Sequence, residues 1–93
     1  MSAITYRFLV ATEPIPGLPG LERGDMVIRT AVEILDGGYE YDVWRRLDDG
    51  MVAKTRIGHR GKLAECAVEG ADMTEVVAKA NKERERLVGN GQG

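Results

Sequence analysis

The sequence predicts an α+β domain: an N-terminal strand, a Pro/Gly-rich loop, a four-stranded antiparallel meander and one C-terminal helix packed on the sheet. Three observations lead to this fold class. Turn signals cut residues 26–68 into short β-type segments, residues 4–10 alternate as a strand does, and the apolar residues of 73–88 recur at helical spacing. We expect residues 1–88 to form a single domain and residues 89–93, GNGQG, to form a disordered tail.

The N-terminal strand is distinguished from the loop after it by alternation and by proline. Apolar residues alternate with others from Ile4 to Val10, which predicts a strand. Residues 11–25 contain all three prolines, which cannot donate to a sheet ladder, so this stretch is predicted to be a loop. Its apolar residues are expected to tuck onto the edge of the core. The alternative is a lid or a partner-contacting loop, which makes Ile15 and Leu18 candidate binding residues.

Three turn signals set the register of the meander. Gly37-Gly38 suits a two-residue type I′ turn, Asp48-Asp49-Gly50 suits a three-residue loop with a left-handed glycine, and Gly58–Gly61 suits a third turn. All three keep the apolar residues on one face, and a slip of one residue would invert that pattern. The resulting cross-strand pairs are Ile34 with Tyr41, Val43 with Thr55, Ile57 with Lys62, and Cys66 with Ala53.

This register divides the sheet into two faces. One face is expected to lie under the helix, and the other carries a tryptophan among cations. The predicted helix-covered residues are Tyr41, Val43, Thr55, Ile57, Ala64 and Cys66, and the opposite face is predicted to hold Trp44, Arg46, Lys54 and Arg56.

The C-terminal helix has a clear start and a clear apolar stripe. Asp72 is a good N-cap, and Glu75 three residues later completes a capping-box pattern. A glycine after Val88 is a natural stop. The residues expected to be buried against the sheet are Val76, Val77, Ala80 and Leu87.

Residues that could perform catalysis are few. His59 is the single histidine and is expected on an exposed turn; Cys66 is the single cysteine and is expected in the core as a small hydrophobe. The alternative is a Cys–His pair, but the predicted register keeps the two apart. No metal-ligand spacing is present, and the glycines of the Pro-rich loop do not stand between a strand and a helix as phosphate-binding glycines do. We therefore expect no catalytic residue, no cofactor, no metal and no enzymatic activity.

The Trp44 face is the best candidate for a working surface. A half-exposed tryptophan beside arginine has the composition of a protein-interface hot spot, whereas aromatic and basic residues on a sheet also suit stacking of single-stranded nucleic acid. A third interpretation is that Trp44 only packs against its neighbours, or that the long loop covers it.

The leading hypothesis is a small non-enzymatic protein-binding module with an accessory, regulatory or inhibitory role. One alternative is a single-stranded DNA- or RNA-binding protein that uses Trp44, Lys54 and Arg56. Another is a small enzyme or ligand binder with a pocket between residues 11–25 and the sheet.

Charge and composition narrow the setting. The net charge is −2, but residues 45–62 carry six cations against two acids. The acidic balance argues against a dedicated nucleic-acid binder, although a local basic patch can bind phosphate. No basic-apolar leader follows Met1, no apolar run could span a membrane and Cys66 has no disulfide partner, so we expect a cytoplasmic protein without a signal peptide. A chain of 93 residues buries a modest core, which makes a homodimer reasonable, and nine arginines against four lysines suit a GC-rich bacterial or phage genome.

Overall fold

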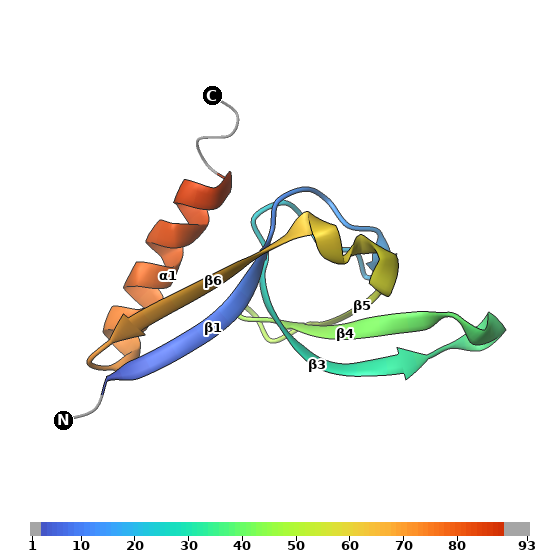
Figure 1. Cartoon of the computed structure of the whole chain (residues 1–93), viewed down its shortest axis with the longest axis horizontal. Coiled ribbons are helices and arrows are strands. Elements are labelled where there is room, and N and C mark those ends of the chain that lie inside the picture. The colour runs from blue at the N-terminus through green and yellow to red at the C-terminus, as the bar shows by residue number, and fades with distance from the viewer. Residues whose placement is uncertain (1–2, 89–93) are drawn as a thin grey trace.

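The computed structural model of the chain describes residues 3–88, apart from the side chain of Asp36, and shows an antiparallel sheet with one C-terminal helix (Figure 1). This confirms the α+β class. Within the described residues the sheet has six strands in the order β2-β5-β4-β3-β1-β6. The predicted tail at 89–93 lies outside these residues. The elements are β1 Ile4–Ala11, β2 Gly17–Leu18, β3 Met26–Ile34, β4 Glu40–Arg46, β5 Val52–Arg56, β6 Leu63–Gly70 and α1 Met73–Val88, with 3₁₀ turns at Asp36–Gly38 and Ile57–Lys62.

The last strand pairs with the first, so the predicted four-stranded meander is wrong at its end. β1 and β6 pair along their whole length, from Ile4 opposite Gly70 to Ala11 opposite Leu63. The 3₁₀ turn Ile57–Lys62 carries the chain from β5 to the far end of the sheet. The predicted pairing of β5 with β6 assumed that a turn joins neighbours, and a turn signal carries no information about a partner strand far away in the sequence.

The first hairpin loop is one residue longer than predicted. It comprises Asp36–Gly38, three residues instead of two, and the N–H of Leu35 donates to the carbonyl of Tyr39 at 3.1 Å. Both of its glycines have positive φ, 87° and 80°, which explains the glycine pair. The extra residue moves the register by one, so Tyr41 lies opposite Glu33.

The second hairpin loop is also one residue longer than predicted. Four residues lie between Arg46 and Met51, and the N–H of Arg46 donates to the carbonyl of Met51 at 2.9 Å. The loop ends on a glycine with φ of 74°, the left-handed conformation that we predicted there. Val43 therefore lies opposite Lys54, and Thr55 is no longer its partner. Because a shift of one residue moves a whole strand to the other face, Lys54 shares a face with Val43 and not with Trp44.

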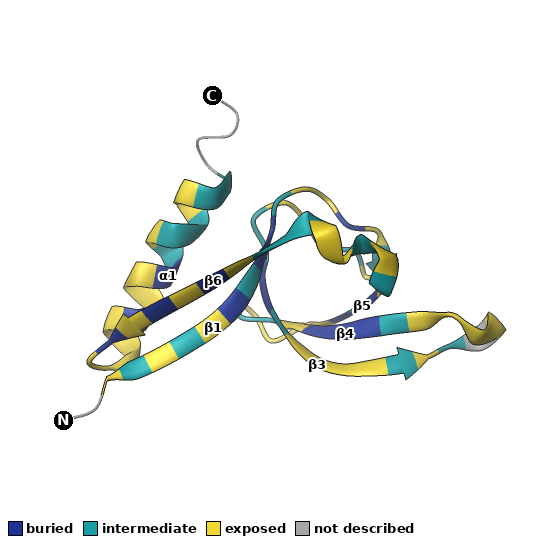
Figure 2. Ribbon diagram, in the orientation of Figure 1, coloured by how far each residue is buried: buried dark blue, intermediate teal, exposed yellow. Residues whose placement is uncertain are grey.

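Two cores lie on opposite faces of this one sheet. Buried residues occur both in β1 and β6, beside α1, and in β4 (Figure 2). α1 covers β1, β6 and the start of β3, and this first core contains Phe8, Val10, Met26, Cys66, Val68, Val76 and Ala80. The loop after β1 covers β3, β4 and β5 from the other side, and this second core contains Ala11, Ile15, Leu21, Val27, Trp44 and Ala53. The prediction that apolar residues of the loop tuck onto the core is thus confirmed for Ile15 and Leu21. It is wrong for Leu18, which lies in the short strand β2 within the predicted loop and is 67% exposed. β1 and β3 pair only at Leu9–Val27 and Val10–Met26, and beyond this junction the two halves of the sheet diverge (Figure 1).

The helix is capped as predicted, but one of its predicted core residues faces solvent. Asp72 Oδ1 accepts from the N–H of Glu75 at 2.9 Å, and Glu75 Oε1 accepts from the N–H of Ala71 at 2.7 Å. Val76 is buried, whereas Val77 is 50% exposed, because the narrow β1–β6 pair covers only one stripe of the helix. Within the described chain no helix is long and apolar enough to span a membrane.

Candidate binding surface

Trp44 and Ile15, two predicted binding residues, are core residues. Trp44 is only 2% exposed, and its Nε1–H donates to Thr55 Oγ1 at 2.8 Å. Ile15 is 1% exposed, and its backbone N–H and carbonyl pair with those of Leu21, which folds the loop into a lid over the indole. The expectation of a half-exposed tryptophan is therefore wrong. The expectation failed because apolar residues of the long loop cover the sheet face on which Trp44 was predicted to be half-exposed.

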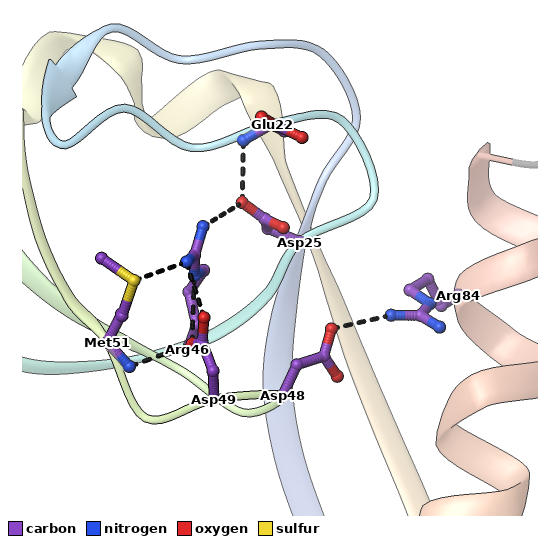
Figure 3. Close-up of polar contacts among 7 residues, drawn as sticks. All are labelled: Glu22, Asp25, Arg46, Asp48, Asp49, Met51 and Arg84. Carbon is purple, nitrogen blue, oxygen red and sulfur yellow. Dashed lines mark hydrogen bonds and ion pairs between the residues drawn. The ribbon is translucent and has the colours of Figure 1, made fainter.

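Arg46 holds a turn in place (Figure 3). Its guanidinium donates to both carboxylate oxygens of Asp49, at 2.7 and 3.3 Å, and lies 3.5 Å from Asp25 at the end of the long loop. The hydrogen bond to Asp49 raises the pKa of Arg46, and the same contact lowers the pKa of the Asp49 carboxyl. Because these carboxylates already occupy the guanidinium, Arg46 is tied to the structure of the turn.

Arg84 and Asp48 extend the same network towards the helix. Arg84 of α1 donates to Asp48 of the turn at 3.3 Å (Figure 3). The turn after β4 is thus tied to the long loop on one side and to the helix on the other.

The remaining predicted binding residues lie on the sheet face that neither the loop nor the helix covers. Residues directly opposite each other in a sheet share a face. Leu18 lies opposite Lys54, Lys54 opposite Val43, and Val43 opposite Ala31, so one row crosses four strands. We call this surface of β2, β5, β4 and β3 the open face. Its members are Leu18, Ile28, Ala31, Glu33, Tyr39, Tyr41, Val43, Arg45, Val52, Lys54 and Arg56.

The open face continues the helix-covered face beyond the end of the helix. Met26 belongs to the helix-covered core, and Ile28, two residues later on the same side of β3, packs against that core. Ile28 lies opposite Arg45, which lies opposite Val52. Because α1 reaches no further than the start of β3, the rows beyond Ile28 have no covering element among residues 3–88.

Aromatic and basic side chains are stacked on the open face. The guanidinium of Arg56 lies 3.9 Å from the centre of the Tyr39 ring and 5.9 Å from that of Tyr41. Lys54 Nζ pairs with Glu33 Oε1 at 2.8 Å. The open face carries three cations, Arg45, Lys54 and Arg56, and one acid, Glu33. This surface is therefore positive, although the net charge of the chain is −2.

Sequence reasoning named Leu18, Lys54 and Arg56 as binding residues, but it placed Leu18 in a loop and the two cations beside Trp44, and it missed both tyrosines and Arg45. The signal that could have found them is loop length, because one more residue in the second hairpin loop places Tyr41, and not Asp42, opposite Arg56. A hollow borders Tyr39 and Arg56 where β5 ends, lined also by Ile57 and His59 of the following 3₁₀ turn.

Within the described part of the chain, nucleophilic and metal-ligating side chains do not come together to form a site. Cys66 is buried in the helix-covered core, as predicted, and this burial raises the pKa of its thiol, so the reactive thiolate is disfavoured. His59 lies in the 3₁₀ turn Ile57–Lys62. Among residues 3–88 no group of three or more His, Cys, Asp or Glu could hold a metal ion.

The space between the long loop and the sheet, a predicted position for a ligand pocket, is filled by Trp44, Ile15 and Leu21. The open face, by contrast, is a sheet surface that no element of residues 3–88 covers. No protein-family model, no curated protein and no solved structure matches this chain.

Proposed function

We propose that this protein is a small non-enzymatic binding module that holds an acidic region of a partner protein against its open face. The observation that supports this is the composition of an uncovered sheet face. Leu18, Tyr39 and Val52 are between 51% and 67% exposed and lie among three cations. Apolar and aromatic area supplies the affinity of a protein interface, and charges around it supply orientation and a fast association rate.

The cations of the open face determine which chemical groups the partner surface must carry. Lys54 is occupied by Glu33, but among residues 3–88 Arg45 and Arg56 form no ion pair with a carboxylate. A guanidinium presents a planar pair of donors that matches a carboxylate in two parallel hydrogen bonds. The partner surface therefore carries aspartate or glutamate beside apolar side chains. The role is accessory, regulatory or inhibitory, and the buried unpaired thiol of Cys66 suits the cytoplasm.

A second candidate is binding of single-stranded DNA or RNA. It rests on Tyr39 and Tyr41, whose rings lie beside Arg56 on the positive face. The first proposal is favoured because Arg56 already covers one side of the Tyr39 ring at 3.9 Å, so a base would have to displace it, and because Glu33 lies within the same surface.

The test is affinity capture from the native cell with three baits: the wild-type chain, the double variant Lys54→Glu/Arg56→Glu and the control Lys82→Glu. Lys82 is exposed on α1, away from the open face. Each capture is done with and without nuclease. We expect a nuclease-resistant protein that binds the wild type and the control and is lost with the double variant. Equal capture by all three baits would exclude the open face.

The same variants separate the two candidates. Loss of the partner on nuclease treatment, together with an oligonucleotide affinity that falls steeply with salt, would establish the nucleic-acid candidate in place of the protein one.

A further inference from the structure

The distal part of β3 is an open sheet edge. β3 pairs with β4 along its length, but its other side meets β1 only at Met26 and Val27. From Ile28 to Ile34 no strand of the described chain lies on that side, because β1 turns away with β6 (Figure 1). Figure 2 shows this stretch of β3 as largely exposed. Unpaired edge groups are a template for pairing with another strand.

The backbone groups on this edge can be assigned from the hairpin. The N–H of Leu35 points to β4, since it donates to the carbonyl of Tyr39. Hydrogen-bonding groups in an antiparallel strand alternate between its two sides, so those of Val32 and Ile34 point outward. Their side chains are apolar and 48% and 69% exposed. An edge with free donors, free acceptors and apolar side chains in the same place is suited to strand addition.

We propose that this edge pairs with the same edge of a second copy of the chain, antiparallel and centred on Val32. Charge supports a second copy as the occupant. The edge is basic near its start, at Arg29, and acidic near its end, at Glu40, which lies opposite Ile34 on the neighbouring strand; both charges lie on the face that carries Val32. A twofold axis reverses one edge against the other, so the basic end of each copy lies beside the acidic end of its partner.

The register follows from the same side chains. Centring the axis on Val32 places Val32 against its own copy and Ile34 against Thr30, which brings four exposed apolar side chains together. Centring it on Glu33 would place two carboxylates directly opposite each other, which is unfavourable. The register shift between Arg29 and Ala31 ends the regular edge at Thr30. The pairing therefore spans residues 30–34.

Two properties of the dimer follow. A contact of this length buries little area, so the dimer should form as the protein concentration rises and dissociate on dilution. Because the axis is perpendicular to the sheet, the two copies form one continuous sheet and their open faces lie on the same side.

The experiment measures sedimentation over a wide concentration range for the wild type, for Val32→Lys and for the control Val77→Lys. Val77 is 50% exposed on α1, which matches the exposure of Val32. We expect the wild type and the control to shift from monomer to dimer as concentration rises, and Val32→Lys to remain a monomer with an unchanged thermal midpoint. A wild-type chain that stays monomeric throughout would overturn the proposal.

Single cysteines then test the register. Under mild oxidation Val32→Cys should give a covalent dimer several-fold faster than the equally exposed Val77→Cys, because only position 32 meets its own copy. The native Cys66 is 5% exposed, so the wild-type chain serves as the blank. Cross-linking by Glu33→Cys in place of Val32→Cys would refute the Val32-centred pairing.

Discussion

Removal of the Trp44 side chain should destabilise the whole domain and not merely weaken binding. The indole is 2% exposed and packs with Ile15, Leu21 and Val27 between the long loop and the sheet. Truncation of a buried Trp to Ala costs about 3–5 kcal/mol. A chain of this size is expected to have roughly 5–14 kcal/mol of total stability. Trp44→Ala should therefore remove a large share of it and lower the denaturation midpoint steeply.

The hydrogen bond of the indole can be measured separately with a double-mutant cycle. Trp44→Phe keeps most of the apolar ring and leaves the Thr55 hydroxyl without its donor, and Thr55→Val leaves the indole N–H without its acceptor. Each should cost about 1–3 kcal/mol, and the double variant should cost about 1 kcal/mol less than the sum. The assay is urea denaturation followed by far-UV circular dichroism, since Trp44 is the single tryptophan.

Val52→Ala, at a residue 51% exposed on the open face, is the matched control and should change little. An unchanged midpoint for Trp44→Ala would refute the assignment of this residue to the core.

Three further predictions concern the ion pair, the thiol and the cap. Asp42 is fully buried and accepts two hydrogen bonds of 2.8 Å from Arg60, so Arg60→Ala leaves a buried carboxylate without its main partner and should lower the urea midpoint. Arg60→Lys should recover only part of the loss, and an unchanged midpoint would contradict the role of this pair. A thiol reagent should label Cys66 slowly in the native protein and rapidly in denaturant, and fast native labelling would contradict its burial. The pKa of Glu75 is lowered, first by the hydrogen bond from the N–H of Ala71 and second by Lys79. The Glu75 carboxylate therefore stabilises the fold fully above the ordinary Glu pKa of about 4.3, and this stabilisation is lost as the pH falls through the lowered pKa. The thermal midpoint of Glu75→Gln should accordingly lie below that of the wild type at neutral pH and approach it in acid; a difference that does not change with pH would show that the charge is not involved.

Local signals in the sequence predicted individual elements well. Alternation placed β1, and the pair Asp72 and Glu75 placed the start of the helix, because each signal acts through residues a few positions apart. The pairing of β1 with β6 could not be predicted in this way, since nothing in 58–61 distinguishes a turn between neighbours from a turn that leads across the sheet.

The candidate site depended on loop lengths that glycine alone does not determine. Gly50 adopts the left-handed conformation expected of it, yet that glycine can end a loop of three or of four residues. The difference of one residue decides whether Lys54 lies beside Trp44 or beside Val43. A second cause was the long loop, since covering Trp44 with Ile15 requires a tertiary contact that no periodicity announces.

The pairing of the first strand with the last has a consequence for the order in which the protein can be built. β3, β4 and β5 are joined by short hairpin loops, so their contacts are local and can form as soon as Arg56 is available. Ile4–Ala11 is synthesised first but has its main partner, Leu63–Gly70, only after most of the chain exists. On the ribosome the apolar side of the first strand must therefore wait for the last strand and helix to emerge. The domain is complete only when Leu63–Gly70 pairs with Ile4–Ala11.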